Sequence, residues 1–140
     1  MVKKQRTWVY SPSKPSPPKV SANTKIILQQ KADELVDKIL KPKHIKLPPA
    51  PDEFQHNYIA DIYTKWYRHY FYFSAKYNVP GPNALVPFFE VKFARLEYIK
   101  ENKFNMAFMR YTGNEWVEVY TDLSLEECLT AIENDPYFEP

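Results

Sequence analysis

Aromatic and basic side chains are interleaved in segment 65–72 of this 140-residue chain. Rings beside cations are typical of sheets that hold single-stranded nucleic acid, because bases stack on the rings and phosphates bind the cations. The outward side chains that would form such a platform are Arg68, Tyr70, Tyr72 and Lys76. The alternative is that a helix or the N-terminal arm covers the tyrosines and that the cations are ordinary rim residues.

A second candidate chemistry comes from Glu90 and Lys92, whose spacing places a carboxylate and an ammonium on one side of a strand. With Asp61 as a second carboxylate, the pattern resembles the catalytic core of restriction-type nucleases, where a metal site works beside a lysine. The same spacing is also common in solvated pairs, and a hairpin at 101–103 stands where that core has a helix. These three residues are therefore an alternative catalytic set, and we expect a binding protein rather than an enzyme.

The charge of the chain is divided between its two parts. Residues 1–50 carry 11 Lys and Arg against 3 Asp and Glu, whereas residues 51–140 carry 8 against 14. We expect a basic, proline-rich arm over 1–20 that is drawn to phosphates, to an acidic protein or to the chain's own acidic part. The arm residues predicted to bind are Lys3, Lys4, Arg6, Trp8 and Tyr10.

Composition restricts the possible environments and ligands. Cys128 is the one cysteine, which excludes an internal disulfide and a cysteine-based zinc site and favours a reducing compartment. The three histidines lack the paired spacing of a metal site. Neither a secretory signal nor a run of 18 apolar residues is visible. We expect a cytoplasmic protein with no metal, no cofactor and no membrane partner.

Apolar residues recur at helical spacing between residues 21 and 41, which predicts an amphipathic helix that Pro42 ends. The residues predicted to face the core are Leu28, Ala32, Leu35, Val36 and Ile39. A proline-rich connector follows over 44–51 and is expected to hold no strand, because proline lacks the N–H that a sheet requires.

Residues 57–77 contain no glycine or proline and are rich in aromatic and β-branched side chains, which is typical of strands. The segment is too long for one strand, so we expect two, near 57–65 and 69–77, with a break between 65 and 69. The inner face of the second strand is predicted to hold Phe71, Phe73, Ala75 and Tyr77.

Three more strands and a helix are predicted after the loop that follows. A strand over 87–99 is expected to contain a bulge, because its apolar alternation changes face after Phe93. Hairpins at 101–103 and 112–114 lead into the next two strands. Ser124 and Glu127 have the spacing of a capping box that begins the last helix.

This order of elements predicts a single α+β domain over 21–140, in which an N-terminal amphipathic helix and a C-terminal helix pack on an antiparallel sheet of about five strands. A cystatin-like roll, in which a strongly curved sheet wraps a helix, is the alternative. For function we expect a small non-enzymatic binding or adaptor protein that engages nucleic acid or an acidic protein through its arm and its Tyr/Arg face. A structural subunit whose arm orders only in an assembly is a further alternative.

Several segments resemble a group of small bacterial proteins of unknown function. They are 93–98, 108–111 with Trp116, 122–129 with Asp135-Pro136, the opening 6–12 and the loop 80–83. The resemblance implies a short antiparallel sheet with flanking helices. It implies no reaction, ligand or catalytic residue.

Overall fold

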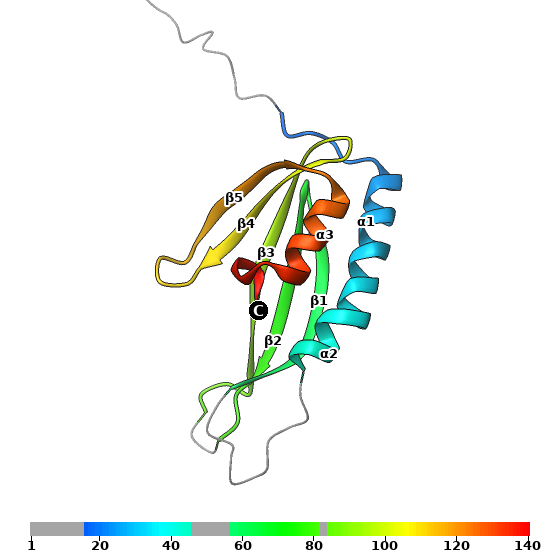
Figure 1. The fold of residues 1–140 in the computed structure, drawn as a ribbon. Coiled ribbons are helices and arrows are strands. Elements are labelled where there is room, and N and C mark those ends of the chain that lie inside the picture. Colours follow the sequence, from blue (N-terminus) through cyan, green and yellow to red (C-terminus); the bar gives the residue numbers. More distant parts are fainter. Residues whose placement is uncertain (1–15, 46–56, 82–83) are drawn as a thin grey trace, which may run out of the picture.

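The structure is a computed structural model that describes residues 16–45, 57–81 and 84–140. In these ranges a helical segment, a five-stranded antiparallel sheet and a second helix follow one another, so the predicted α+β class is confirmed (Figure 1). The arm residues 1–15 and most of the predicted connector lie outside the described residues.

The strands of the described sheet pair in the order in which they occur in the sequence, which leaves β1 and β5 at the two edges. They are β1 (Tyr58–Tyr67), β2 (Tyr70–Asn78), β3 (Phe88–Lys100), β4 (Lys103–Arg110) and β5 (Glu115–Leu123). The predicted break between the first two strands is confirmed as a tight turn at Arg68 and His69. Arg68 adopts a φ of 56°, a left-handed conformation suited to such a turn.

The inner face of the sheet is the one that packs against the helices. Residues directly opposite one another on neighbouring strands point to the same side, so register shows which residues share this face. Thr64 pairs with Phe73 and Trp66 pairs with Phe71 across β1 and β2. Of the predicted inner residues of β2, Phe71, Phe73 and Ala75 are buried, and Tyr77 is half-buried.

A bulge interrupts the pairing of β2 with β3 at the position that the sequence indicated. The register shifts between Phe73 and Ser74, and on the partner strand both Phe93 and Ala94 are buried although they are adjacent. An extra residue in one strand has this effect, because it reverses the alternation beyond it. Arg95 is consequently turned to the outer side of the sheet.

The N-terminal helix is longer than predicted. It runs as α1 (Ala22–Leu35), a π-helical turn η2 (Val36–Leu40) and α2 (Lys41–His44). The N–H of Lys41 donates to the carbonyl of Val36 across this wider turn. Pro42 then lies in the first turn of α2, where a residue without an N–H is tolerated, so the prediction that it ends the helix is wrong.

The same turn corrects the predicted apolar stripe. Ile39 is 37% exposed, whereas Leu40 is 1% exposed. A π-helical turn holds more residues than an α-helical turn, so the residues after it are rotated and Leu40 takes the place over the sheet. The helix residues that are fully buried are Leu28, Ala32, Val36 and Leu40.

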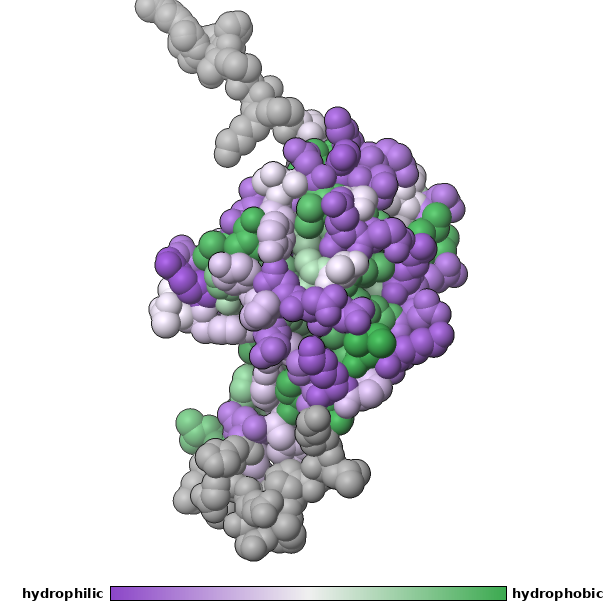
Figure 2. All heavy atoms as spheres, viewed as in Figure 1, coloured by the Kyte–Doolittle hydropathy of each residue, from purple (hydrophilic) through white to green (hydrophobic). Residues whose placement is uncertain are grey.

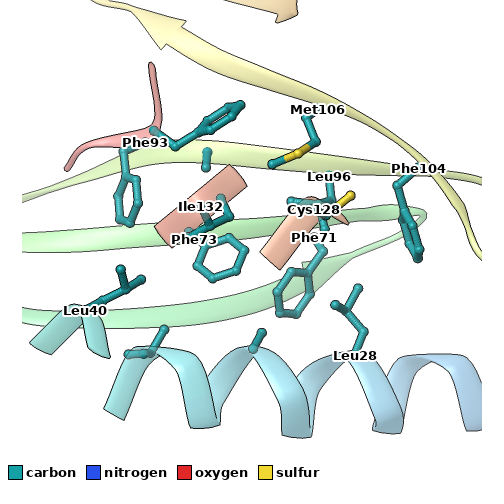
Figure 3. Packing of buried hydrophobic residues seen from close by; sticks show 14 of the residues in the cluster. Leu28, Leu40, Phe71, Phe73, Phe93, Leu96, Phe104, Met106, Cys128 and Ile132 are labelled. Carbon is teal, nitrogen blue, oxygen red and sulfur yellow. The ribbon is translucent and has the colours of Figure 1, made fainter. Parts of the chain in front are cut away.

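Helix α3 (Leu125–Asn134) begins with the predicted capping box, in which Ser124 and Glu127 exchange hydrogen bonds, and a short 3-10 turn η4 (Pro136–Phe138) follows it. Figure 1 shows α1 and α3 on the same face of the sheet. Their apolar side chains, among them Leu28, Cys128 and Ile132, meet Phe71 and Phe73 in one core (Figure 3). The outward surfaces of both helices are largely hydrophilic (Figure 2).

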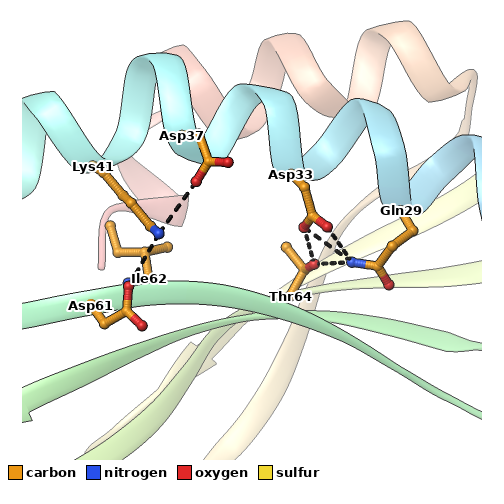
Figure 4. A network of polar contacts seen from close by, with 7 residues as sticks. All are labelled: Gln29, Asp33, Asp37, Lys41, Asp61, Ile62 and Thr64. Carbon is orange, nitrogen blue, oxygen red and sulfur yellow. Dashed lines mark hydrogen bonds and ion pairs between the residues drawn. The ribbon is translucent and has the colours of Figure 1, made fainter.

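Polar contacts also fix the N-terminal helix to strand β1 (Figure 4). The side-chain amide of Gln29 donates to Asp33 at 3.0 Å and also to the Thr64 hydroxyl, which in turn donates to Asp33. Further along, the ammonium of Lys41 lies 3.2 Å from Asp37 and 3.3 Å from Asp61. The carboxylates of Asp37 and Asp61 raise the pKa of Lys41. No helix in the three described ranges is long and apolar enough to cross a bilayer.

Candidate functional site

The sheet face turned away from α1 and α3 is not covered by a helix in the described part of the chain (Figure 1). We call this surface the open face and assign residues to it by their register with one another. Among its members are Tyr63, Lys65 and Tyr67 of β1, Tyr70, Tyr72, Ser74 and Lys76 of β2, Glu90, Lys92, Arg95 and Glu97 of β3, and Trp116 and Glu118 of β5.

Three of the four residues predicted for the aromatic platform lie together on this face. Tyr70, Tyr72 and Lys76 alternate along β2, and the Lys76 ammonium lies 4.3 Å from the ring centre of Phe88. Arg68 lies instead in the turn between β1 and β2, where its guanidinium is 5.3 Å from the ring of Tyr67. It therefore extends the row of rings and cations past the end of the strands.

Arg95 lies at the centre of the rings, and it is not among the residues predicted to bind. Its guanidinium carbon is 4.8 Å from the ring centre of Tyr70 and 5.0 Å from that of Trp116. The Trp116 ring is also 5.7 Å from that of Tyr72. The bulge at Phe93 is the sequence signal that predicts the outward orientation of Arg95, whereas its contact with Trp116 depends on the pairing of three strands.

Tyr72 is flanked by cations on both neighbouring strands. Lys65 lies directly opposite it on β1, and the Lys92 ammonium lies 5.5 Å from its ring centre on the β3 side. Burial raises the pKa of Tyr72, although the neighbouring Arg95 opposes this shift. Among the described residues, no carboxylate forms an ion pair with Lys65, Lys92 or Arg95. Their positive charges are therefore not neutralised by a carboxylate of this part of the chain.

A pocket of about 620 Å³ opens beside Tyr72 on this face. Its lining comes from three neighbouring strands: Tyr63, Lys65, Tyr67, Tyr72, Ser74, Glu90, Val91 and Lys92. The hydroxyl of Tyr63 on β1 donates to Oε2 of Glu90 on β3 at 2.5 Å, so this hydrogen bond crosses strand β2. Burial and the bond to Glu90 both raise the pKa of Tyr63, which keeps it protonated as the donor.

Residues 20–140 match the model of a protein family described as Domain of unknown function (DUF3024). The chain belongs to the DUF3024 family. This membership agrees with the resemblance to proteins of unknown function that the sequence indicated. Searches among curated proteins and among solved structures find no match to the chain.

In this DUF3024 domain the two carboxylates of the alternative catalytic set, Asp61 and Glu90, have different partners. Asp61 and Glu90 are both in register with Lys76, so they lie on strands on either side of β2. The Asp61 carboxylate lies beside Lys41 of the helix, whereas that of Glu90 accepts a bond from Tyr63 on the open face. Among the described residues, no group of three or more His, Cys, Asp or Glu side chains has a geometry that would hold a metal ion.

The predicted binding residues of the arm come before the first residue that the structure describes. Lys3, Lys4, Arg6, Trp8 and Tyr10 lie outside the described residues of the domain. Its first described residues, 16–19, are exposed, and Val20 is buried next to the start of α1. The binding role of the five arm residues stays a prediction.

Proposed function

We propose that this protein binds single-stranded nucleic acid on the open face of its sheet and is not an enzyme. The observation that carries the proposal is the environment of Tyr72, a ring on an uncovered sheet face with the Lys92 ammonium 5.5 Å from its centre and Lys65 opposite it on β1. A base stacks on such a ring whatever its identity, while the adjacent phosphates bind the cations. The paired rings of Tyr70 and Trp116 on Arg95 offer a second place for stacking.

The proposal includes the basic arm and the cellular compartment. Lys3, Lys4 and Arg6 precede the domain without any acidic residue among them, so electrostatic attraction would draw them to the phosphates of a strand lying on the open face. The single buried cysteine supports a reducing compartment, and we propose that the protein works in the cytoplasm.

Fluorescence anisotropy with a labelled 12-nucleotide oligothymidylate tests the proposal on the full chain. We expect binding that weakens steeply with salt, as for a ligand that displaces counterions. Tyr72→Ala should weaken binding roughly tenfold, since one stacked base contributes about 1–3 kcal/mol. Lys92→Ala should lower the slope of log affinity against log salt by about 0.7, the value for one phosphate contact of a single strand.

Lys38→Ala is the matched control for charge. Lys38 is an exposed lysine on the helix side of the molecule, where it pairs with Glu34, so its loss should leave the salt slope nearly unchanged. A lack of binding at low salt would overturn the proposal. Equal binding of polyglutamate and oligothymidylate would show that the cations act alone and would favour an acidic protein as the partner.

A further inference from the structure

Three of the polar residues that line the pocket on the open face are Tyr63, Ser74 and Glu90, and Lys92 lies opposite Ser74 on β3. Tyr63 is in register with Ser74 on β2, and its hydroxyl holds Oε2 of Glu90 at 2.5 Å. The carboxylate is therefore placed near Ser74, which is the next residue after Tyr72 on the same face of β2. Residues two apart on a strand are separated by about 6.8 Å, which is close to the width of a base.

Both oxygens of the Glu90 carboxylate can accept a hydrogen bond from a ligand, because each has two lone pairs. Oε2 accepts the Tyr63 hydroxyl, and Oε1 has no hydrogen-bond partner among the described residues. An ionised carboxylate only accepts hydrogen bonds and can hold two donors side by side. It therefore attracts a base edge that presents adjacent N–H groups and repels an edge that presents carbonyl oxygens.

Guanine is the base with this edge, because its N1–H and its 2-amino group are adjacent donors. Adenine and cytosine present one amino group beside an acceptor nitrogen, while thymine and uracil present one N–H between two carbonyl oxygens. In a single strand these Watson–Crick edges are unpaired and are the edges that proteins read. Guanine is therefore the one base of the five that can donate to both acceptor oxygens of Glu90 at once.

We infer that Glu90 makes this pocket select guanine from a bound single strand, an inference that rests on the proposed function. The guanine stacks on Tyr72 with its Watson–Crick edge toward Glu90, and the phosphates on either side of it lie near Lys65 and Lys92. Tyr63 acts as a positioning residue, since its hydroxyl holds the carboxylate toward the pocket. The hydrogen bonds from guanine to Glu90 would compensate for the repulsion between this carboxylate and the phosphates of the strand.

Three labelled oligothymidylates of equal length test the inference on the full chain by anisotropy. Each carries one central substitution: guanine, hypoxanthine (as inosine) or adenine. We expect the guanine strand to bind at least about fivefold more tightly than the adenine strand, as for a bidentate contact to one base. The inosine strand should fall between them, because hypoxanthine keeps N1–H and lacks the 2-amino group.

Glu90→Gln should remove the difference between guanine and inosine, since the amide offers one acceptor and places a donor beside it. Glu118→Gln is the control with the same change of charge, because Glu118 lies on the open face outside the pocket. It should keep the guanine preference. Far-UV circular dichroism shows whether both variants are folded. If Glu90→Gln does not fold, the comparison of the guanine and inosine strands on the unaltered chain still tests the inference.

Each outcome separates the two proposals. Equal affinity of the unaltered chain for the three strands would overturn the guanine inference and leave the proposed function intact. A guanine preference that persists in folded Glu90→Gln would also overturn it. Failure to bind any strand, oligothymidylate included, would overturn the proposed function and this inference with it.

Discussion

The hydroxyl of Thr64 on β1 lies 2.5 Å from Oδ1 of Asp33 on α1 and donates a hydrogen bond to it. This bond attaches the helix to the edge strand of the sheet through two half-buried side chains. Because Gln29 also donates to Asp33, the carboxylate is the shared acceptor of the group. The docking of α1 therefore depends on Asp33 as well as on apolar packing.

Asp33→Ala should lower the free energy of unfolding by about 1–3 kcal/mol, because two partly buried donors lose a charged acceptor. Urea denaturation followed by circular dichroism measures the change. Glu34→Ala is the control on the next residue, since Glu34 is exposed and pairs only along its own helix. If both variants unfolded at the same urea concentration, the Asp33 network would not contribute to docking.

The ring of Phe73 connects the sheet to the core, and its removal should be among the most costly changes in the domain. It is fully buried and lies 5.5 Å from the ring of Phe71 and 6.2 Å from that of Phe93. Phe73→Ala should cost about 3–5 kcal/mol through lost burial and the cavity it leaves. Ile26→Ala, at a side chain that is 55% exposed, should cost far less in the same denaturation experiment.

Cys128 should not react with thiol reagents in the folded protein. Burial raises the pKa of its thiol from 9.0 to about 12, and the thiolate is the reactive form. At pH 8 we expect no reaction with Ellman's reagent until a denaturant is added. Rapid labelling of the folded chain would contradict the packing of Cys128 against the sheet.

The same thiol makes stability depend on alkaline pH. Above pH 9 the unfolded chain releases the proton, whereas the folded chain keeps it up to about pH 12. The folded state then binds more protons, so the free energy of unfolding falls as the pH rises through this window. Cys128→Ala should show a shallower decline than the unaltered chain when urea midpoints are measured between pH 8 and pH 11.

The cap of α3 should respond to mutation and to acid. Ser124→Ala removes the acceptor for the Glu127 N–H and should cost about 0.5–2 kcal/mol. The hydrogen bonds from Ser124 lower the pKa of Glu127 below 4.5, so its contribution is present above pH 4.5 and is lost as the pH falls through the lowered value. Ser124→Ala keeps the backbone N–H that donates to Glu127, so it should weaken this acid dependence only in part, whereas Thr130→Ala on the same helix should leave it unchanged.

Much of the fold could be predicted because its signals are local. The alternation of Phe71, Phe73 and Ala75 sets one inner face, since successive side chains of a strand point to opposite sides. The loss of alternation after Phe93 indicated the bulge for the same reason. Ser124 and Glu127 indicated the start of α3, because a capping box needs only residues three apart.

The helix that continues past Pro42 is the clearest failure of local reasoning. Proline normally ends a helix because it lacks an N–H and its ring clashes with the carbonyl of the residue four positions earlier. A π-helical turn before Pro42 is a costly geometry that a sequence pattern does not favour. Packing of Leu40 on the sheet and pairing of Lys41 with Asp61 supply the tertiary contacts that stabilise it.

The sequence by itself determined which residues are helical or extended near each cap, turn and bulge, and it placed Tyr70, Tyr72 and Lys76 on one side of a strand. Only the tertiary structure decided that Arg95 lies between Tyr70 and Trp116, and that Tyr63 reaches Glu90 across β2. The physical reason is the separation in sequence over which each kind of interaction acts. Steric and hydrogen-bonding preferences act over a few residues, whereas contacts between strands depend on register, and register is set by the packing of the whole sheet against its helices.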